Sequence, residues 1–342
     1  MKILIVKTSS LGDIVQAFPV LELLKGAFPY SFIDWVVEAR CSAIVKANPL
    51  VNKVIEIDSK PLTFSNLKAA FRSVSTCRYD VVIDLQGNIK SGFLTFFSRS
   101  AKKVGFARES VAEWPNILAT NIRYNVLGSE DMSADYISIV RQHFNLEQEG
   151  VFKTVLSCDE EQISLLSNNY PDLSRTILIC TGSNWPNKRL LPEQWSLLMD
   201  GLLKGTNFKY LFVQSNAEEL SLAVDMSKKD RGRIGVLERL SLPLLQNTML
   251  YSSGVIAMDS LPLHLAGLAK VPIFGIFGPS MSGKYMPRGH GNSCYQAGCP
   301  YGKVFDKRCK ELRSCATGDC LKKVAISALL DKMLLWANLR EG

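Results

Sequence analysis

The sequence contains no long apolar run. None of its apolar stretches approaches the roughly 20 residues that a membrane-spanning helix needs. The amino-terminal run ILIV is closed by Lys7, well short of the about 7–15 apolar residues of a secretory signal. We therefore expect a soluble, cytoplasmic protein.

Clustered positive charge is also missing. The net charge is +8, but no run of five or more basic residues occurs, and the basic residues are not interleaved with aromatics as in nucleic-acid-binding proteins. The charge is consistent with a scattered, solvated surface. It is equally consistent with a polyanionic partner such as a nucleotide, a phosphorylated glycolipid or an acidic membrane face.

The chain has nine cysteines but no C-x-x-C pair, the spacing most typical of zinc sites. The odd number, with no secretory signal, argues against a disulfide framework. Four scattered cysteines are expected to be buried thiols. The other five form a segment that either binds a structural metal or holds reduced thiols. The scattered ones are Cys41, Cys77, Cys158 and Cys180, and the segment holds Cys294, Cys299, Cys309, Cys315 and Cys320.

Short β-branched runs alternate with helical patterns, which predicts an α/β fold with parallel sheets. The 342 residues are enough for two domains, which we place at 1–150 and 151–342. Helices are expected from about 13 to 27 and over 321–338. The expected strands are 2–7, 32–37, 53–57, 79–87, 176–180, 209–214, 254–258 and 271–278.

Ligands of such sheets bind beyond the carboxyl ends of the strands, so a cleft between two facing domains is the expected site. No G-x-G-x-x-G follows the first strand. The segment GPSMSGKY (278–285) nearly matches a P-loop, but Tyr285 replaces the magnesium-binding hydroxyl and Pro287 falls where the helix should begin. A P-loop is therefore not expected.

Two other loops are candidates for binding an anion. TGSNWPNKR (181–189) offers the hydroxyls of Thr181 and Ser183 and the cation of Lys188, although an ordinary loop would look similar. In AMDSLPLHLAGLAK (257–270), Asp259 or Ser260 is expected to cap a helix whose first amides favour a diphosphate. His264 lies near the start of that helix and has either a structural or a ligand-binding role.

The segment KTSSLGDIVQ (7–16) follows the first strand and ends in Asp13 before an expected helix. Aspartate at this point is a preferred helix cap. It is also placed to act as a general base if the acceptor hydroxyl comes within hydrogen-bonding reach. Ser9, Ser10 and Gly12 would then shape the loop.

Five segments together resemble one enzyme family, the bacterial lipopolysaccharide heptosyltransferases of glycosyltransferase family 9. The KTSSLGD and DWVVE forms are most similar to the branch that adds the first heptose to the inner core. The segments are ILIVKTSSLGDIVQAFPVLELL (3–24), DWVVEA (34–39), YDVVIDLQGNIKSG (79–92), NKRLLPEQW (187–195) and MDSLPLHLAGLAKVPIFGIFGP (258–279).

The resemblance implies a GT-B fold, with an amino-terminal acceptor-binding and a carboxyl-terminal nucleotide-sugar-binding Rossmann-like domain. It implies transfer of heptose from ADP-heptose to a Kdo sugar on lipid A, with inversion and without a required metal or other cofactor. The acceptor implies peripheral contact with the inner face of the inner membrane, which suits the basic net charge.

The resemblance also assigns roles to individual residues. Asp13 matches the catalytic base and Lys188 the lysine on the donor diphosphate. Asp259 matches an aspartate near the donor heptose, and Ser260 and His264 fall in the diphosphate-binding turn. Arg108 matches an acceptor-side arginine.

Three features depart from the family pattern. Leu261 and Pro262 follow Ser260 where the family has a glycine, Met132 and Asp135 stand in place of its His-x-x-Glu, and the cysteine segment is more typical of other members. Two alternatives therefore remain: a transferase of the same fold that uses another nucleotide sugar or acceptor, and a nucleotide-sugar-binding protein without turnover.

Overall fold

The computed structural model describes residues 1–58, 64–126, 131–147 and 152–341 and divides the chain into two compact units, Met1–Ser157 and Cys158–Gly342. The division falls after Ser157 rather than after residue 150, which itself lies outside the described residues. The intervening segment belongs to the first unit, because Thr154 Oγ1 donates to Glu22 and the Ser157 amide donates to the carbonyl of Ala47.

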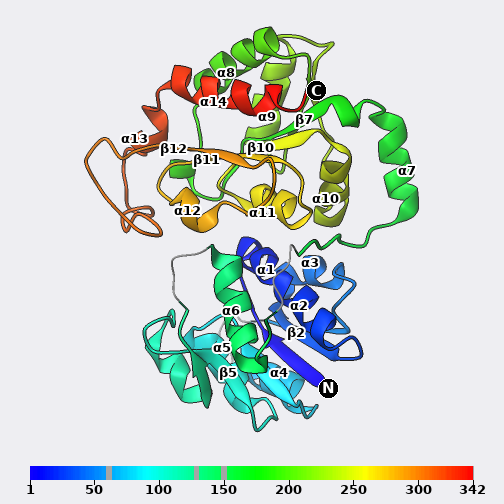
Figure 1. Cartoon of the computed structure of the whole chain (residues 1–342), viewed down its shortest axis with the longest axis vertical. Helices are drawn as coiled ribbons and strands as arrows, with labels where there is room; N and C mark the ends of the chain where they lie inside the picture. The colour runs from blue at the N-terminus through cyan, green and yellow to red at the C-terminus, as the bar shows by residue number, and fades with distance from the viewer. Residues whose placement is uncertain (59–63, 127–130, 148–151, 342) are drawn as a thin grey trace. The chain divides into compact units, whose positions relative to one another are not determined.

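The first unit is a six-stranded sheet in which all strands are parallel, in the order β3-β2-β1-β4-β5-β6. Its strands are β1 (Lys2–Val6), β2 (Phe32–Glu38), β3 (Lys53–Ile57), β4 (Val81–Asp84), β5 (Lys103–Phe106) and β6 (Ile122–Tyr124). Its helices are α1 (Leu11–Ala17), α2 (Pro19–Ala27), η1 (Ala39–Cys41), α3 (Ser42–Lys46), α4 (Phe64–Ser75), α5 (Ile89–Phe97), η2 (Trp114–Ala119) and α6 (Met132–Phe144). Helices lie on both faces of the sheet (Figure 1).

The second unit repeats this topology, in the order β9-β8-β7-β10-β11-β12 and again with all strands parallel. Its strands are β7 (Thr176–Cys180), β8 (Lys209–Val213), β9 (Ile234–Val236), β10 (Gly254–Met258), β11 (Ile273–Phe277) and β12 (Ser293–Gln296). Its helices are α7 (Glu160–Asn169), η3 (Leu173–Arg175), η4 (Pro186–Lys188), α8 (Pro192–Gly205), α9 (Ala217–Ser227), α10 (Leu242–Tyr251), α11 (Leu261–Leu268), α12 (Ser282–Tyr285), α13 (Asp319–Lys322) and α14 (Ile326–Asn338).

Both units therefore have the strand order of a Rossmann fold, and the expected α/β class is confirmed. The central strands β1, β7 and β10 are almost wholly buried, as their uninterrupted apolar runs predict for sheets covered on both faces. Among the described residues, no helix is both long and apolar enough to cross a membrane.

Two predicted helices are interrupted. The helix expected from 13 to 27 begins earlier, at Leu11, and breaks at Phe18, because Pro19 starts a second helix where a proline is tolerated. The tail expected as one helix over 321–338 consists of α13 and α14, separated by Lys323–Ala325.

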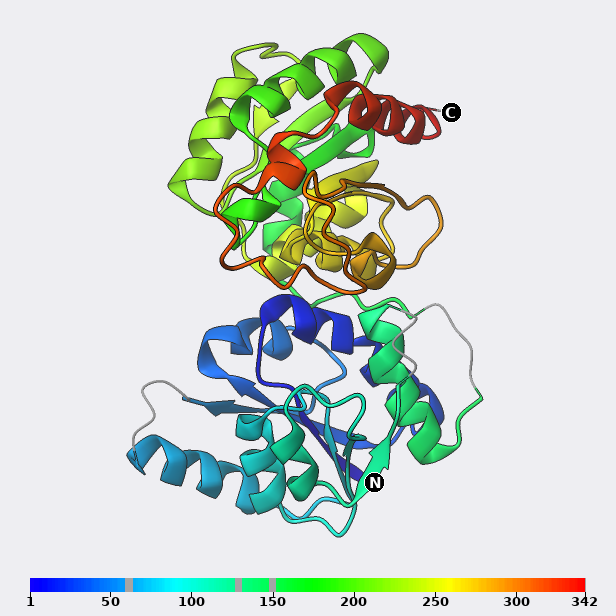
Figure 2. The same ribbon diagram turned by 90° about the vertical axis from the view of Figure 1, so that its left-hand side faces the viewer.

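Helix α14 packs on α8 within the second unit, as both ribbon views show (Figures 1 and 2). The approach is close at Gly201, where an added Cβ would lie 2.2 Å from Cδ2 of Leu330. Trp336 of α14 is buried, with its ring 5.9 Å from that of Phe274, and its Nε1 donates to the carbonyl of Gly291. The carboxyl-terminal helix is thus part of the second unit's core.

The turn after β4 is organised by Asp84, whose side chain is fully buried. Its Oδ1 accepts the amides of Gln86 and Gly87 at 2.9 and 3.0 Å. Its Oδ2 accepts from Thr95 Oγ1 at 3.2 Å and Asn116 Nδ2 at 2.7 Å. One carboxylate therefore joins β4, α5 and η2.

We predict that Asp84→Ala lowers the free energy of unfolding by at least about 3 kcal/mol, because several buried donors lose their acceptor at about 1–3 kcal/mol each. Urea denaturation of the full chain measures this. The control Asp80→Ala, at an exposed carboxylate that accepts from the Lys2 amide, should cost about 1 kcal/mol or less. Equal losses in the two variants would contradict the role assigned to Asp84.

Candidate functional site

Asp13 lies in the first turn of α1, and we call the segment from Lys7 to Asp13, which leads into this turn from β1, the Asp13 loop. Ser10, in an extended conformation, is the N-cap of α1, and its amide and hydroxyl donate to Asp13 Oδ2 at 3.1 and 2.7 Å. Asp13 is therefore the third residue of the helix and not the residue before it, because Ser10 occupies the cap. The carboxylate supports the helix start and lies near its positive end.

The Asp13 loop is held from the neighbouring strand. Gln86, directly after β4, accepts the amides of Thr8 and Ser9 through Oε1 at 3.1 Å each. The Gly12 carbonyl accepts from Gln16 Nε2 at 3.2 Å. Because β1 and β4 flank the point where the strand order reverses, Asp13 lies at the position where Rossmann sheets bind ligands.

Lys7 is a residue of this site that the sequence analysis treated only as the end of a strand. Its side chain is buried, and its Nζ donates to the Tyr136 hydroxyl at 2.9 Å, 4.7 Å from the ring centroid. Burial lowers the pKa of Lys7, while the carboxylates of Asp13 and Asp84 act in the opposite direction. In the sequence, this residue could have been found as a lysine that directly follows a buried apolar strand.

The remaining acceptor-side candidates lie in the same unit. Ser9 and Gly12 are half-buried in the Asp13 loop. Arg108 is exposed in a turn just beyond the carboxyl end of β5, in a different loop. The structure thus groups the serines and the glycine with Asp13 and places Arg108 at the same edge of the sheet, two strands away from β1 in the sheet order.

In the second unit, the two residues at the centre of the candidate anion site form a buried ion pair. Lys188 in η4 donates through Nζ to Asp259 Oδ2 at 2.5 Å, and both side chains are less than a tenth exposed. Burial raises the pKa of Asp259, but the charges of Lys188 and His264 and the hydrogen bond from Lys188 outweigh it, so the pKa lies below 3.8, its ordinary value. Asp259 is therefore ionised at neutral pH.

The other predicted donor-side residues surround this pair. His264 Nε2 lies 4.0 Å from Asp259 Oδ1, and the Ser183 hydroxyl lies 3.5 Å from the Asp259 carbonyl oxygen. Thr181 is buried directly after β7. Ser260 is the N-cap of α11, but its hydroxyl donates backward to the Met258 carbonyl at 3.2 Å.

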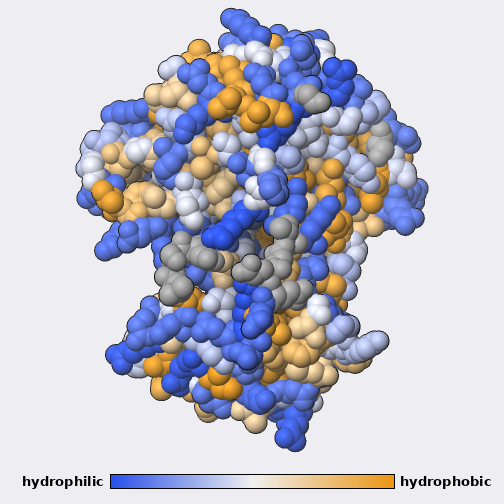
Figure 3. All heavy atoms as spheres, in the orientation of Figure 1, coloured by the Kyte–Doolittle hydropathy of each residue, from blue (hydrophilic) through white to orange (hydrophobic). Residues whose placement is uncertain are grey.

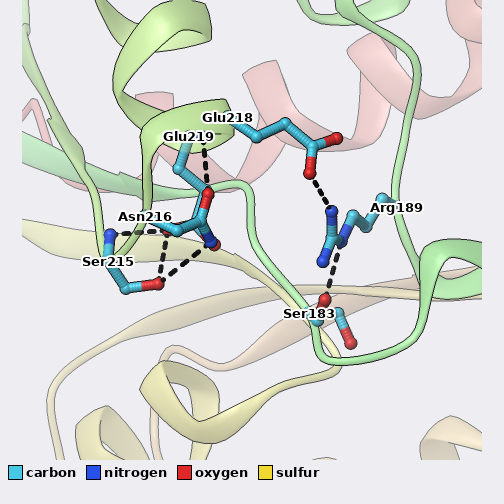
Figure 4. A network of polar contacts seen from close by, with 6 residues as sticks. All are labelled: Ser183, Arg189, Ser215, Asn216, Glu218 and Glu219. Carbon is cyan, nitrogen blue, oxygen red and sulfur yellow. Dashed lines mark hydrogen bonds and ion pairs between the residues drawn. The ribbon is translucent and has the colours of Figure 1, made fainter.

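The loop of Ser183 is anchored to α9 by Arg189 (Figure 4). Its Nε donates to the Ser183 carbonyl and its Nη1 to Glu218 Oε2, both at 2.6 Å. Next to it, Glu219 accepts from Ser215 and Asn216 (Figure 4). Gly182 lies against the end of this side chain, and an added Cβ 1.9 Å from Glu219 Oε1 would displace that carboxylate.

The cysteine segment supports the same loop from the other side. Asn187, next to Lys188, donates through Nδ2 to the carbonyls of Leu312 and Cys315 at 3.1 and 2.9 Å. The Arg313 guanidinium lies 5.2 Å from the Trp185 ring centroid. The segment therefore helps to position Lys188.

The five clustered cysteines are half-buried free thiols, distributed over β12, the following loops and α13. Hydrogen bonds from Gly318 and Thr317 lower the pKa of Cys315, whereas burial raises the pKa of Cys320. Within the described part of the chain, no group of three or more His, Cys, Asp or Glu side chains is arranged to hold a metal ion.

Residues 67–314 match the profile of glycosyltransferase family 9 (heptosyltransferase), and this is well over half of the chain. The chain belongs to glycosyltransferase family 9. The protein is therefore an enzyme, and the alternative of a binding protein without turnover is not retained.

Curated relatives agree with this family. Lipopolysaccharide heptosyltransferase 1 of Campylobacter coli is 27% identical in an alignment of 295 positions that covers 82% of this chain and 85% of the relative. The protein of the same name from Pseudomonas aeruginosa is 26% identical in an alignment of 306 positions that covers 83% of this chain and 80% of the relative.

Solved structures show the same fold. A family 9 glycosyltransferase of Veillonella parvula superposes with a TM-score of 0.81 at 19% identity, covering 99% of this chain and 97% of that one. Escherichia coli heptosyltransferase WaaC, solved with ADP, gives 0.74 at 21%, covering 87% and 94%. The fold is accordingly GT-B.

We predict that Lys188→Met and Asp259→Asn each lower the free energy of unfolding by about 3–5 kcal/mol, because each leaves a buried charge or polar group without its partner. The double variant should lose about 1–3 kcal/mol less free energy of unfolding than the two single losses added together. Urea unfolding of all four proteins measures this coupling.

The coupling should be the same at pH 7 and pH 5. A depressed carboxyl pKa contributes stability above the unfolded value of 3.8 and loses it only as the pH falls through the lower folded value. Additive single losses, or a coupling that disappears by pH 5, would contradict the ion pair.

Proposed function

We propose that this protein transfers heptose from ADP-heptose to a Kdo sugar of the lipopolysaccharide inner core, with inversion at the anomeric carbon. Family membership and the relatives named lipopolysaccharide heptosyltransferase 1 support the reaction class. The similar structure that was solved with ADP supports the nucleotide. The observation that carries the proposal is the buried Lys188–Asp259 pair at the start of α11.

Lys188 and α11 form the donor side in this proposal. The Lys188 ammonium is fixed by Asp259, and the first amides of α11 provide the positive end of a helix dipole beside it. Both would stabilise the negative charge that develops on the leaving ADP. Because they are in place before the reaction, they act without reorganisation, and the proposal includes no metal or other cofactor.

Asp13 is the general base in this proposal. The Asp13 carboxylate takes the proton of the acceptor hydroxyl as the oxygen forms its bond to the anomeric carbon. The bond from that carbon to the β-phosphate oxygen breaks, and ADP leaves with the electron pair. Ser10 fixes the orientation of the carboxylate, and the buried Lys7 interacts electrostatically with it.

A second candidate is a transferase that uses another nucleotide sugar. It is favoured by Leu261, which begins α11 where the resemblance implies glycine and so places a side chain at the turn. Thermal shift with ADP-heptose and a panel of other ADP- and UDP-sugars separates the two. A larger shift with a sugar other than ADP-heptose would favour the second candidate.

We predict that Asp13→Asn lowers kcat by about 10²–10⁴-fold, because a general base contributes this much. Release of ADP on adding donor and acceptor measures the rate, and calorimetry should give an unchanged Kd for ADP. The control Ser10→Ala removes one hydrogen bond to the same carboxylate. If Asp13 served only to begin the helix, the two variants would lose similar activity.

We predict that Lys188→Gln weakens ADP binding by roughly 10–100-fold. This factor corresponds to the loss of one hydrogen bond to a charged group, which contributes about 1.5–3 kcal/mol. Calorimetry with ADP measures it, after circular dichroism confirms the fold. Lys209→Gln is the matched control, because Lys209 is an exposed lysine at the start of β8 that pairs with Asp172. An unchanged Kd for Lys188→Gln would remove its donor role.

A further inference from the structure

Helix α5 presents an apolar face to solvent. Its inner side is buried through Ser91, Gly92, Leu94 and Thr95. Its other side carries Ile89, Phe93, Phe96 and Phe97, at positions i, i+4, i+7 and i+8 of one helical face. Ile89 and Phe96 are each 59% exposed. A surface helix normally turns polar residues outward, so this face is unusual.

The exposed apolar side chains continue onto the neighbouring elements. The Phe97 ring lies 5.1 Å from Phe71 of α4, 4.7 Å from Phe93 and 5.1 Å from Phe96. Helix η2 packs on α5 and adds Trp114 and Leu118, which are 62% and 73% exposed. We call these side chains the α5 surface: Phe71, Ile89, Phe93, Phe96, Phe97, Trp114 and Leu118.

One basic side chain contacts the α5 surface directly, and the surrounding sequence is rich in basic residues. The Lys103 ammonium lies 5.5 Å from the Phe96 ring centroid and donates to the Phe96 carbonyl at 2.5 Å. Over residues 64–119 there are eight Lys or Arg and four Asp or Glu, of which Asp84 is fully buried. The basic residues are Lys68, Arg72, Arg78, Lys90, Arg99, Lys102, Lys103 and Arg108.

The start of the α5 surface is close to the Asp13 loop. Asn88 caps α5, and Gln86, two residues earlier, accepts the amides of Thr8 and Ser9. The Ile89 amide donates to Glu113, which precedes Trp114. The apolar surface therefore begins at the edge of the sheet that carries the proposed base.

We propose that the α5 surface docks on an anionic lipid bilayer. Exposed aromatic rings in a segment rich in Lys and Arg are the composition of a surface that enters the headgroup region, where the rings are buried and the cations meet lipid phosphates. The space-filling view shows apolar side chains among hydrophilic ones on the visible face of this unit (Figure 3). The excess of basic residues favours lipid over a second copy of the chain, which would carry the same charge.

The biological role of docking in this inference rests on the proposed function. A lipid-linked acceptor stays in the membrane, so a docked α5 surface would bring the acceptor sugar to the edge of the sheet where Asp13 lies. Docking itself does not depend on the identity of the donor or of the acceptor.

The test is co-sedimentation of the full chain with vesicles of phosphatidylethanolamine and phosphatidylglycerol, compared with phosphatidylcholine alone. The wild-type protein should bind the anionic vesicles and dissociate at high salt. Phe96→Ser with Trp114→Ser should weaken binding roughly tenfold or more, because two large apolar side chains no longer leave water. Arg99→Ala with Lys102→Ala should also weaken it.

The matched control is Leu197→Ser with Tyr251→Ser, which removes two exposed apolar side chains, 57% and 50% exposed, from the other unit. Its binding should equal that of the wild type. Wild-type protein that stays in the supernatant, or a Phe96/Trp114 variant that sediments normally, would overturn the proposal. A wild-type dimer in light scattering that is lost in this variant would instead assign the surface to self-association.

Activity separates this proposal from the proposed function. On a water-soluble, deacylated acceptor, the Phe96/Trp114 variant should keep the wild-type rate, and on a vesicle-embedded acceptor its rate should fall. Vesicle binding by a chain that releases no ADP would leave the docking surface intact and contradict only the proposed function.

Discussion

Parallel pairing of every strand is the constraint on which the arrangement of the site depends. It places all the carboxyl ends of a sheet at one edge, and the order β3-β2-β1-β4-β5-β6 makes the chain reverse its direction of growth once, between β1 and β4. The second sheet does the same between β7 and β10. Asp13 follows β1, whereas Lys188 and Asp259 follow β7 and β10, so the proposed groups occupy equivalent points of two sheets.

The two units hold a buried lysine in different ways. Lys188 meets a carboxylate directly, and this contact helps to lower the pKa of Asp259. Lys7 instead contacts the phenol of Tyr136 and its ring, and burial lowers the pKa of Lys7 despite the charges of Asp13 and Asp84. The first arrangement aligns a lysine with a buried carboxylate beside the start of α11, whereas the second holds a lysine on a phenol next to the Asp13 loop.

Much of the fold could be predicted from the sequence, because the central strands are uninterrupted apolar runs between helical patterns. The strands that were not predicted, β5, β6, β9 and β12, have only three or four residues, and the last three are partly exposed. So short a run carries little periodicity. The break at Phe18 was not predicted, because Pro19 is compatible with a helix start that the continuing apolar pattern conceals.

The site was predictable to a similar extent. Local motifs and the family resemblance pointed to Asp13, Lys188, Asp259 and His264, and the structure brings the last three together. The pairing of Lys188 with Asp259 joins residues 71 positions apart and is set by the neighbouring strands β7 and β10, which no local pattern encodes. The hydrogen bonds from Asn187 to the cysteine segment, which support the Lys188 loop, also join distant parts of the sequence and are not encoded by a local pattern.

The chain passes between its two units once, at Ser157–Cys158, and its last helix packs within the second unit, to which it belongs. Each half thus has its own sheet, its own core and one set of proposed reacting groups. A family built this way can exchange one half by recombination at a single point, without cutting through a core. New acceptors and new donors can then be acquired separately during evolution, and the same junction is the natural place to join halves from different relatives in the laboratory.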